Sequence, residues 1–266
     1  MILVTTALPI EAKPLVSRLG LTAIADEAYP VYKGEDYVLV VTGVGALKAS
    51  AATGWAMARF PGIFAAINAG FCGAAPEVAG LHEWVYISSI RDKASGRLSI
   101  PDILQKHPFR EAALLTVPTV VKDRIDWNGV VDMEGSGFFE AARKFVSPDQ
   151  ISLIKWVSDP LTGSIHLEET SRAYAEGLDP AVDFIRQWPR FLEGKMDKAP
   201  EELVGQVEQR LKLTSTQRHY VRKWASGYLA RGGDPGEVYR LLPEAVPASK
   251  SQNTRIFESL KNVFKN

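Results

Sequence analysis

Apolar runs alternate with segments of helical spacing through residues 1–157. Uninterrupted runs rich in β-branched residues are typical of strands buried on both faces of a mostly parallel sheet. The predicted strands are residues 1–7, 37–42, 63–68, 84–90, 114–121 and 151–157, and the predicted helices are residues 8–19, 46–59 and 135–145. Pro118 favours an edge strand or a bulge for the fifth run. This alternation predicts an α/β layer fold, with glycine-rich residues 69–73 and polar residues 91–113 as loops.

The pattern changes after residue 162, because no further run is typical of a strand. Helices are predicted at 166–194, 200–231, 234–242 and 251–264, with breaks at Asp179–Pro180, Trp188–Pro189 and Gly232–Gly233. We therefore expect an α/β domain over residues 1–165 and an all-helical C-terminal extension over residues 166–266.

Composition adds little that is specific to one function. The chain has 266 residues and a formal net charge of zero, which excludes a gross field directed at nucleic acid or membrane. Residues 212–266 nevertheless carry ten Lys/Arg and four Asp/Glu, a surplus of 10 − 4 = +6. A single cysteine, Cys72, excludes an internal disulfide and fits the cytoplasm. We expect no signal peptide and no membrane span, because no apolar run approaches the ~20 residues that a span needs.

Residues 130–145 hold the most informative stretch. A short apolar run is followed by Asp132, Met133 and Glu134, and then by a glycine-rich helix start. Glu11 and Asp159 also follow predicted strands, and ligands of open α/β sheets bind beyond the carboxyl ends of strands. The Gly-Val-Gly turn at 43–45 precedes a helix and can hold an anion there. The sequence thus predicts a small-molecule site.

Each of these acids also has a structural explanation. Glu11 fits a solvated acid in a first helical turn, where the helix dipole favours it. Glu134 fits a helix cap, and Asp159, which precedes a proline, fits a turn. Cys72 fits a small buried side chain, since no histidine lies in a supporting motif.

Five segments at predicted strand ends resemble the nucleoside phosphorylase/nucleosidase superfamily. They are residues 7–11, 42–45, 67–73, 131–135 and 157–159, and the resemblance covers roughly residues 1–165. This superfamily includes purine nucleoside phosphorylases, 5′-methylthioadenosine/S-adenosylhomocysteine nucleosidases and futalosine hydrolases. The resemblance implies a three-layer mixed sheet flanked by helices, a small-molecule nucleoside as ligand, and no cofactor.

The resemblance also implies roles for individual residues. Glu134 would bind the ribose hydroxyls, and Met133 would pack against the sugar. Glu11 would position the attacking water, and Asp159 would protonate or hydrogen-bond the leaving purine. Cleavage of an N-glycosidic bond through an oxocarbenium-like sugar needs such groups. The remaining predicted substrate-binding residues are Asp132, Gly70, Phe71 and Val117.

Departures from the family pattern bear on whether water or phosphate cleaves the nucleoside. Phosphorylases bind phosphate with a serine where this chain has Phe71, and no arginine near residues 43–45 or just before Gly70 replaces it. Hydrolysis is therefore favoured over phosphorolysis. The chain is more similar to the futalosine-hydrolase branch of the family at Phe71, residues 116–120 and Phe138–Phe139. The connection between residues 121 and 130 is short, and a second acid after Asp159 is absent. The alternatives are a phosphorylase or a catalytically weak nucleoside-binding protein.

The remaining residues bear on metal ions, nucleic acid and other subunits as partners. His82, His107, His166 and His219 lack metal-ligand spacing, so we expect no metal. Residues 217–223 are basic around Tyr220, which is compatible with nucleic-acid binding. A solvated helix face docked on the acidic domain or a subunit boundary is favoured, with Trp224 and Tyr228 burying the opposite face. The family tendency predicts a homodimer.

Overall fold

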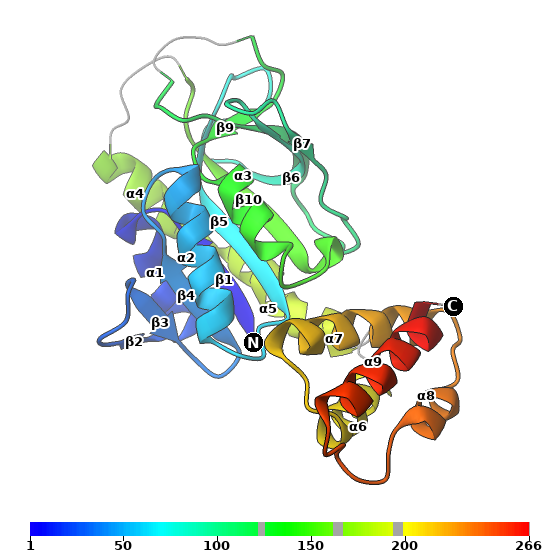
Figure 1. Ribbon diagram of the computed structural model, residues 1–266. Helices are drawn as coiled ribbons and strands as arrows, with labels where there is room; N and C mark the ends of the chain where they lie inside the picture. The colour runs from blue at the N-terminus through cyan, green and yellow to red at the C-terminus, as the bar shows by residue number, and fades with distance from the viewer. Residues whose placement is uncertain (122–125, 162–166, 194–198, 266) are drawn as a thin grey trace. The chain divides into compact units, whose positions relative to one another are not determined.

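The computed structural model describes residues 1–121, 126–161, 167–193 and 199–265 (Figure 1). Its strands are β1 Ile2–Thr6, β2 Thr22–Ile24, β3 Val31–Lys33, β4 Tyr37–Val41, β5 Ala65–Ala74, β6 Trp84–Asp92, β7 Leu98–Ser99, β8 Arg110–Thr116, β9 Val130–Asp132 and β10 Ile151–Asp159. Its helices are α1 Pro9–Leu19, α2 Ala46–Arg59, α3 Gly135–Ala142, α4 Leu167–Glu176, α5 Asp179–Glu193, α6 Ala199–Arg210, α7 Ser215–Ala230, α8 Pro235–Leu241 and α9 Lys250–Lys265. None of the described helices is long and apolar enough to cross a membrane.

The strands form one mixed sheet in the order β10-β6-β8-β9-β5-β1-β4-β3-β2. An additional pairing of β10 with β5 closes β5, β9, β8, β6 and β10 into a ring. β1 runs parallel to both β4 and β5, and β10 runs parallel to β5, so these strands end at the same edge. The register places Lys155 beside Gly70 and Asp159 beside Gly73.

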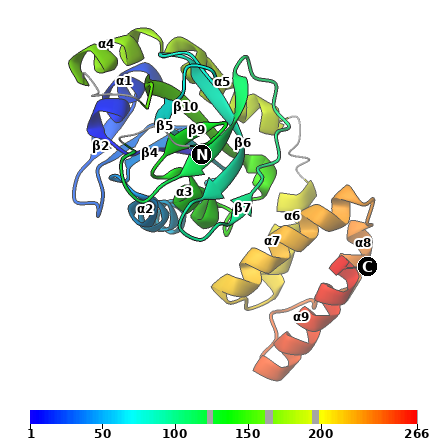
Figure 2. The same cartoon turned by 90° about the horizontal axis from the view of Figure 1, so that it is seen from above.

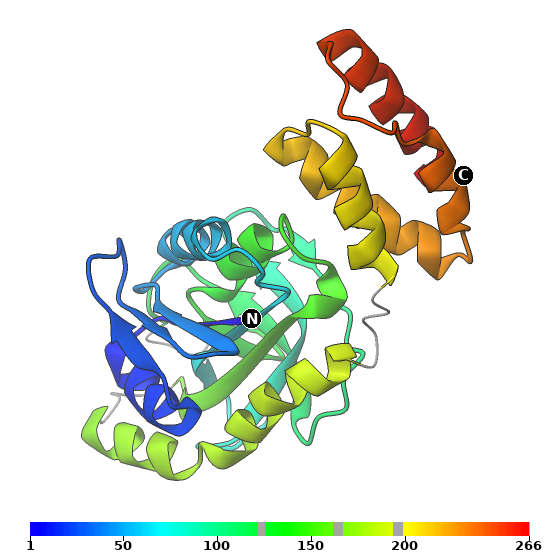
Figure 3. The same cartoon turned by 90° about the horizontal axis from the view of Figure 1, so that it is seen from below.

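Helices cover both faces of this sheet, as the α/β layer prediction requires. Figures 2 and 3 show α1, α4 and α5 on one face and the paired helices α2 and α3 on the other. The core between them is built from aliphatic strand residues and from the alanines of α2. α1 ends at Gly20, as predicted, because the left-handed φ of 66° there favours glycine. The three-layer mixed sheet is therefore confirmed.

Several strand boundaries differ from the sequence prediction. The glycine-rich stretch 69–73 is not a loop but the second half of β5, because β10 and β9 both pair with it. β8 begins at Arg110, inside the stretch predicted as irregular, and ends at Thr116. Pro118 has no N–H to continue the ladder, so the strand predicted to residue 121 stops earlier. The short strands β2 and β3 were not predicted.

The helical half contains its own differences. α5 continues through Pro189, where a break was predicted, whereas the break before Asp179 is confirmed. The single helix predicted over residues 200–231 is two helices, α6 and α7. Thr214 separates them, because its hydroxyl accepts a hydrogen bond from the Gln217 N–H and caps α7.

The chain divides into two compact units, Met1–Pro189 and Arg190–Asn266. The boundary predicted between residues 165 and 166 lies outside the described residues. α4 and most of α5 belong to the first unit, where Tyr174 and Trp188 are buried. The loss of strand pattern in the sequence therefore marks a change of secondary structure and not the end of the first unit. The second unit holds α6 to α9 around a separate core.

Candidate functional site

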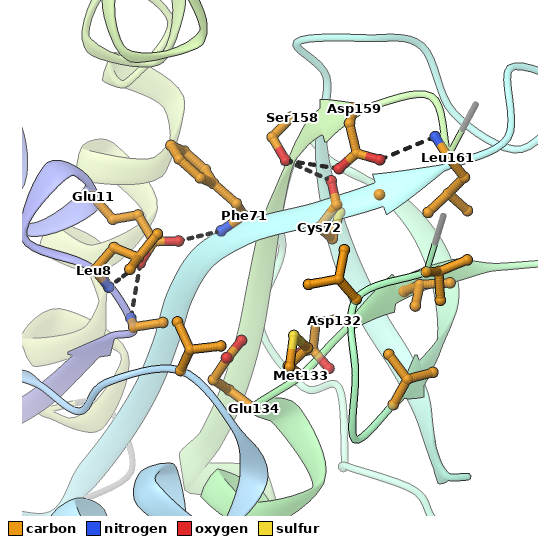
Figure 4. A pocket seen from close by; sticks show the side chains of 17 residues that line it. Leu8, Glu11, Phe71, Cys72, Asp132, Met133, Glu134, Ser158, Asp159 and Leu161 are labelled. Carbon is orange, nitrogen blue, oxygen red and sulfur yellow. Dashed lines mark hydrogen bonds between the residues drawn. The ribbon is translucent and has the colours of Figure 1, made fainter. Parts of the chain in front are cut away.

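A cavity of about 590 Å³ lies at the edge where β1, β5, β9 and β10 end. It is lined by all but one of the predicted site residues, namely Glu11, Phe71, Val117, Asp132, Met133, Glu134 and Asp159. Figure 4 shows the labelled ones, Glu11, Phe71, Asp132, Met133, Glu134 and Asp159, arranged around one space. Gly70 does not line the cavity, but it lies against Glu11, since a Cβ at Gly70 would be 3.0 Å from Oε1 of Glu11. The fold therefore brings the predicted residues together.

Glu11 is a buried acid, 2 % exposed, and not a solvated helix-start side chain as the alternative supposed. Its Oε2 accepts hydrogen bonds from the N–H groups of Ala7 and Leu8, both at 2.8 Å, and its Oε1 accepts one from the N–H of Phe71 at 2.7 Å. Burial raises the pKa of Glu11, although these bonds and the charge of Lys155 act in the opposite direction. The carboxylate is thus fixed in orientation at the cavity wall.

Glu134 occupies the N-cap position of α3 and is 6 % exposed. Its Oε1 accepts a hydrogen bond from the N–H of Gly45 at 2.9 Å. The Gly-Val-Gly turn predicted to hold an anion therefore holds this carboxylate. Burial and the neighbouring charge of Asp132 raise the pKa of Glu134 to about 7, while Lys155 and the Gly45 bond oppose the shift. Glu134 can change its charge near neutral pH.

Asp132 lines the cavity, but its oxygens are engaged within the protein. Oδ1 accepts from the hydroxyl of Thr116, and Oδ2 accepts from the N–H of Gly135, each at 2.8 Å. The ammonium of Lys155 also lies 2.8 Å from Oδ2. These contacts position the start of α3 and leave Asp132 less free than Glu134 to bind a ligand.

Lys155 is a functional candidate that sequence reasoning missed. It lies in the middle of β10 and is 1 % exposed. Burial lowers the pKa of Lys155, but Asp132, Glu134 and Glu11 outweigh burial and raise it above its ordinary value. Lys155 is therefore a buried cation among acids. The sequence feature that could have identified Lys155 is a lysine within an otherwise uncharged strand-like run.

Asp159 ends β10 beside the cavity and also forms a turn. Its Oδ1 accepts from the N–H of Leu161 at 3.0 Å, and its Oδ2 accepts from the hydroxyl of Ser158 at 3.2 Å. Leu161 adopts a left-handed φ of 57°, which brings its side chain against Gly73. The turn alternative is thus correct in geometry, and it is compatible with a role in the cavity.

The rest of the wall is mostly apolar. Met133 and several valines, including Val117 and Val120, line it together with Phe71, whose ring packs edge-on against Tyr174 at 5.0 Å. No lysine, arginine or histidine is among the described lining residues. Cys72 is buried, which raises the pKa of its thiol well above the ordinary value and makes a thiolate unfavourable. Within the described residues no group of three or more His, Cys, Asp or Glu could hold a metal ion.

Comparison with known proteins relates this architecture to solved structures. No protein-family model and no curated protein matches the chain. An MTAN variant from Chlamydia trachomatis is 24% identical, with a TM-score of 0.53, covering 68% of this chain and 97% of its own. A 5′-methylthioadenosine/S-adenosylhomocysteine nucleosidase from Neisseria meningitidis is 16% identical, with a TM-score of 0.56, covering 66% and 94%. A futalosine hydrolase mutant from Helicobacter pylori is 13% identical, with a TM-score of 0.53, covering 68% and 98%.

These structures span about two thirds of this chain and nearly all of their own. That extent is close to the length of the first compact unit. At such identities the likeness establishes the fold and leaves the chemistry to the residues of this chain. The α/β part of the chain therefore has the fold of these nucleosidase and futalosine hydrolase structures.

Proposed function

We propose that this protein hydrolyses the N-glycosidic bond of a purine-type nucleoside, of the methylthioadenosine/adenosylhomocysteine or the futalosine class. The observation that carries the proposal is the convergence of Glu11, Glu134 and Asp159 on one cavity. A volume of about 590 Å³ is within the range of small-molecule sites. The nucleosidase fold of the solved relatives supports the same reaction class.

The proposed role of Glu134 follows from its second carboxylate oxygen, and that of Glu11 from its fixed orientation. Oε1 of Glu134 accepts from Gly45, so Oε2 is the oxygen left to accept hydrogen bonds from ribose hydroxyls. Met133 packs against the sugar, with Phe71 and Val117 on the cavity wall. Glu11 accepts a proton from the attacking water, and its fixed orientation aims that water at the sugar. The acids also favour the positive charge that develops on the sugar.

Asp159 assists the departure of the base. Both of its oxygens accept hydrogen bonds in the structure, from Leu161 and from Ser158. Asp159 must therefore hydrogen-bond the base through the lone-pair sites that these two bonds leave. This requirement motivates the second candidate, a protein of the same fold that binds a nucleoside with little turnover.

Water is favoured over phosphate as the acceptor. The described lining residues include acids but no cationic side chain, so a phosphate anion would be repelled. Lys155, a buried cation in the middle of β10, is already paired with Asp132. Phe71 supplies an apolar ring at the place where the resemblance implies a phosphate-binding serine.

The test is incubation of the purified protein with methylthioadenosine, adenosylhomocysteine, futalosine, inosine and adenosine, with and without phosphate. We expect free base without phosphate, and strongly reduced release by Glu134→Gln, Glu11→Gln and Asp159→Asn. Glu176→Gln, on the exposed end of α4, is the matched control and should retain activity. Base released only with phosphate would identify a phosphorylase. A thermal shift with nucleoside but no product would identify the binding protein.

The proposal also covers the oligomeric state of the protein and its location in the cell. We propose a homodimer in the cytoplasm, with a small-molecule nucleoside as the partner of the site. Light scattering coupled to gel filtration would measure the mass, and a value of about one chain at micromolar concentration would contradict the dimer. Fractionation of cells that express the full chain would test the location.

A further inference from the structure

The second compact unit, Arg190–Asn266, presents chemistry that the proposed reaction does not use. Its described helices bury a continuous apolar core that includes Leu203, Val221 and Leu260. The matched solved structures span only about two thirds of this chain. The likeness to those structures therefore says nothing about the surface of this unit, whose own residues indicate what it can bind.

One side of α7 is exposed and basic. We call Arg218, His219, Tyr220, Arg222 and Lys223 the α7 face; all five side chains are exposed. Arg218 and Arg222 are four residues apart, as are His219 and Lys223, so they form adjacent rows on the helix. α7 contains no acidic residue. The opposite side, with Val221, Ala225 and Tyr228, is buried in the core of the unit, as was predicted for Tyr228.

Tyr220 forms an aromatic platform at the edge of the α7 face. Its ring is stacked on that of Trp224, with centroids 5.4 Å apart and planes inclined by 17°. Trp224 packs in turn against Phe257 of the core, at 5.8 Å. Tyr220 remains 45% exposed. The ring is thus supported by Trp224, lies 5.9 Å from the ring of His219, and is partly open to solvent.

Positive charge lies to one side of this platform, first in the adjacent row of His219 and Lys223 and then in the row of Arg218 and Arg222 beyond it. Within the described residues, Arg218 and Lys223 make no ion pair, and Arg222 makes one pair with the partly buried Glu208, at 3.5 Å. The formal surplus of +6 over residues 212–266 adds to the local field. The guanidinium of Arg222 is mostly exposed and has five N–H donors, so it can contact a further anion while it keeps its pair with Glu208.

We propose that the α7 face binds single-stranded nucleic acid, with an unpaired base stacked on Tyr220 and phosphates contacting Arg218, Arg222 and Lys223. Aromatic stacking combined with a basic surface is the general mode of single-strand binding. A duplex offers no open base to the ring, and an acidic peptide offers no flat surface, so the platform selects among anions. The stacked and exposed ring is the observation that favours this surface over the solvated helix face expected from sequence.

The test is fluorescence anisotropy of a labelled 20-nucleotide oligo-dT with the full-length protein in 50 mM KCl. We expect saturable binding that weakens as salt rises, with a log–log slope of about −2 for three phosphate contacts. Tyr220→Ala should weaken binding about five- to 150-fold, because stacking contributes ~1–3 kcal/mol per base, whereas Tyr220→Phe should keep most of the affinity. Tyr239→Ala is the matched control, because Tyr239 lies on α8 of the same unit and is 37% exposed.

Charge is tested separately. The double variant Arg218→Gln/Lys223→Gln should make the salt slope shallower by about 1.4, whereas Lys33→Gln/Lys144→Gln, which removes two exposed charges from the first unit, should leave it unchanged. No binding at 100 μM protein, equal affinity of Tyr220→Ala and the parent, or equal competition by poly-glutamate would each overturn the proposal. A duplex that binds more tightly than the single strand would overturn it as well.

Discussion

Glu134→Gln tests the electrostatic description of the cavity without reference to any substrate. The amide oxygen of glutamine can still accept the hydrogen bond from Gly45, so the substitution removes charge and little else. The pKa of Glu134 is raised from 4.5 to about 7 by burial and by Asp132. This difference of about 2.5 pH units corresponds to about 3 kcal/mol, since one unit is worth about 1.4 kcal/mol.

The sign of this pH dependence follows from the number of protons bound by the folded and the unfolded chain. Between pH 4.5 and 7 the folded protein holds a proton on Glu134 that the unfolded chain has released. Folding is therefore favoured at low pH, and this contribution is lost as pH rises through that window. Above pH 7 the wild-type protein carries the full electrostatic penalty of a buried carboxylate, whereas the glutamine variant does not.

We therefore expect Glu134→Gln to gain up to about 3 kcal/mol of stability relative to wild type on going from pH 5 to pH 8. The measurement is urea unfolding followed by tryptophan fluorescence at several pH values. Glu176→Gln, on an exposed stretch of α4, should show no such trend. A difference between Glu134→Gln and wild type that is independent of pH, or that grows toward low pH, would refute the reasoning.

Three further pairs of substitutions test packing in and around the site. Lys155→Met should lower the free energy of unfolding by about 3–5 kcal/mol, because it leaves Asp132 buried without its cation, and Asp132→Asn in the same chain should recover part of the loss in urea unfolding. Tyr174→Phe should raise the melting temperature, because that buried hydroxyl has no hydrogen-bond partner among the described residues, whereas Tyr86→Phe should lower it by breaking the 2.5 Å contact with Ser152. Gly137→Ala should destabilise, because its Cβ would lie 1.9 Å from the carbonyl oxygen of Ala46, whereas Gly54→Ala in α2 meets open space and should stabilise by about 0.5–1 kcal/mol.

The sequence was sufficient for features that depend on neighbouring residues. Apolar runs located the long strands, and a residue that directly follows a strand must lie at the carboxyl edge of the sheet. Glu11, Glu134 and Asp159 could be brought to one cavity by that rule, together with the motif resemblance. Caps such as Gly20 were also local, because a left-handed φ at a helix end favours glycine.

Features that depend on distant partners could not be predicted in this way. Residues 69–73 are a strand only because β9 and β10 lie on its two sides. The division between α6 and α7 depends on a Thr214 cap that competes with favourable helical spacing. The alternative that Glu11 is solvated failed for a similar reason, since the N–H of Phe71, sixty residues away in the chain, binds and covers it.

Lys155 shows why such a partner matters for the chemistry as well as for the fold. Glu11, Asp132 and Glu134 approach one another at the ends of β1 and β9, and their mutual repulsion in a buried cavity would oppose folding. The single lysine among them lies against Asp132, which is the acid already bound by Thr116 and Gly135. Its charge is thereby directed to the residue that fixes the start of α3. Glu134, which receives less of that charge, is the acid left to titrate near pH 7 and to bind a ligand.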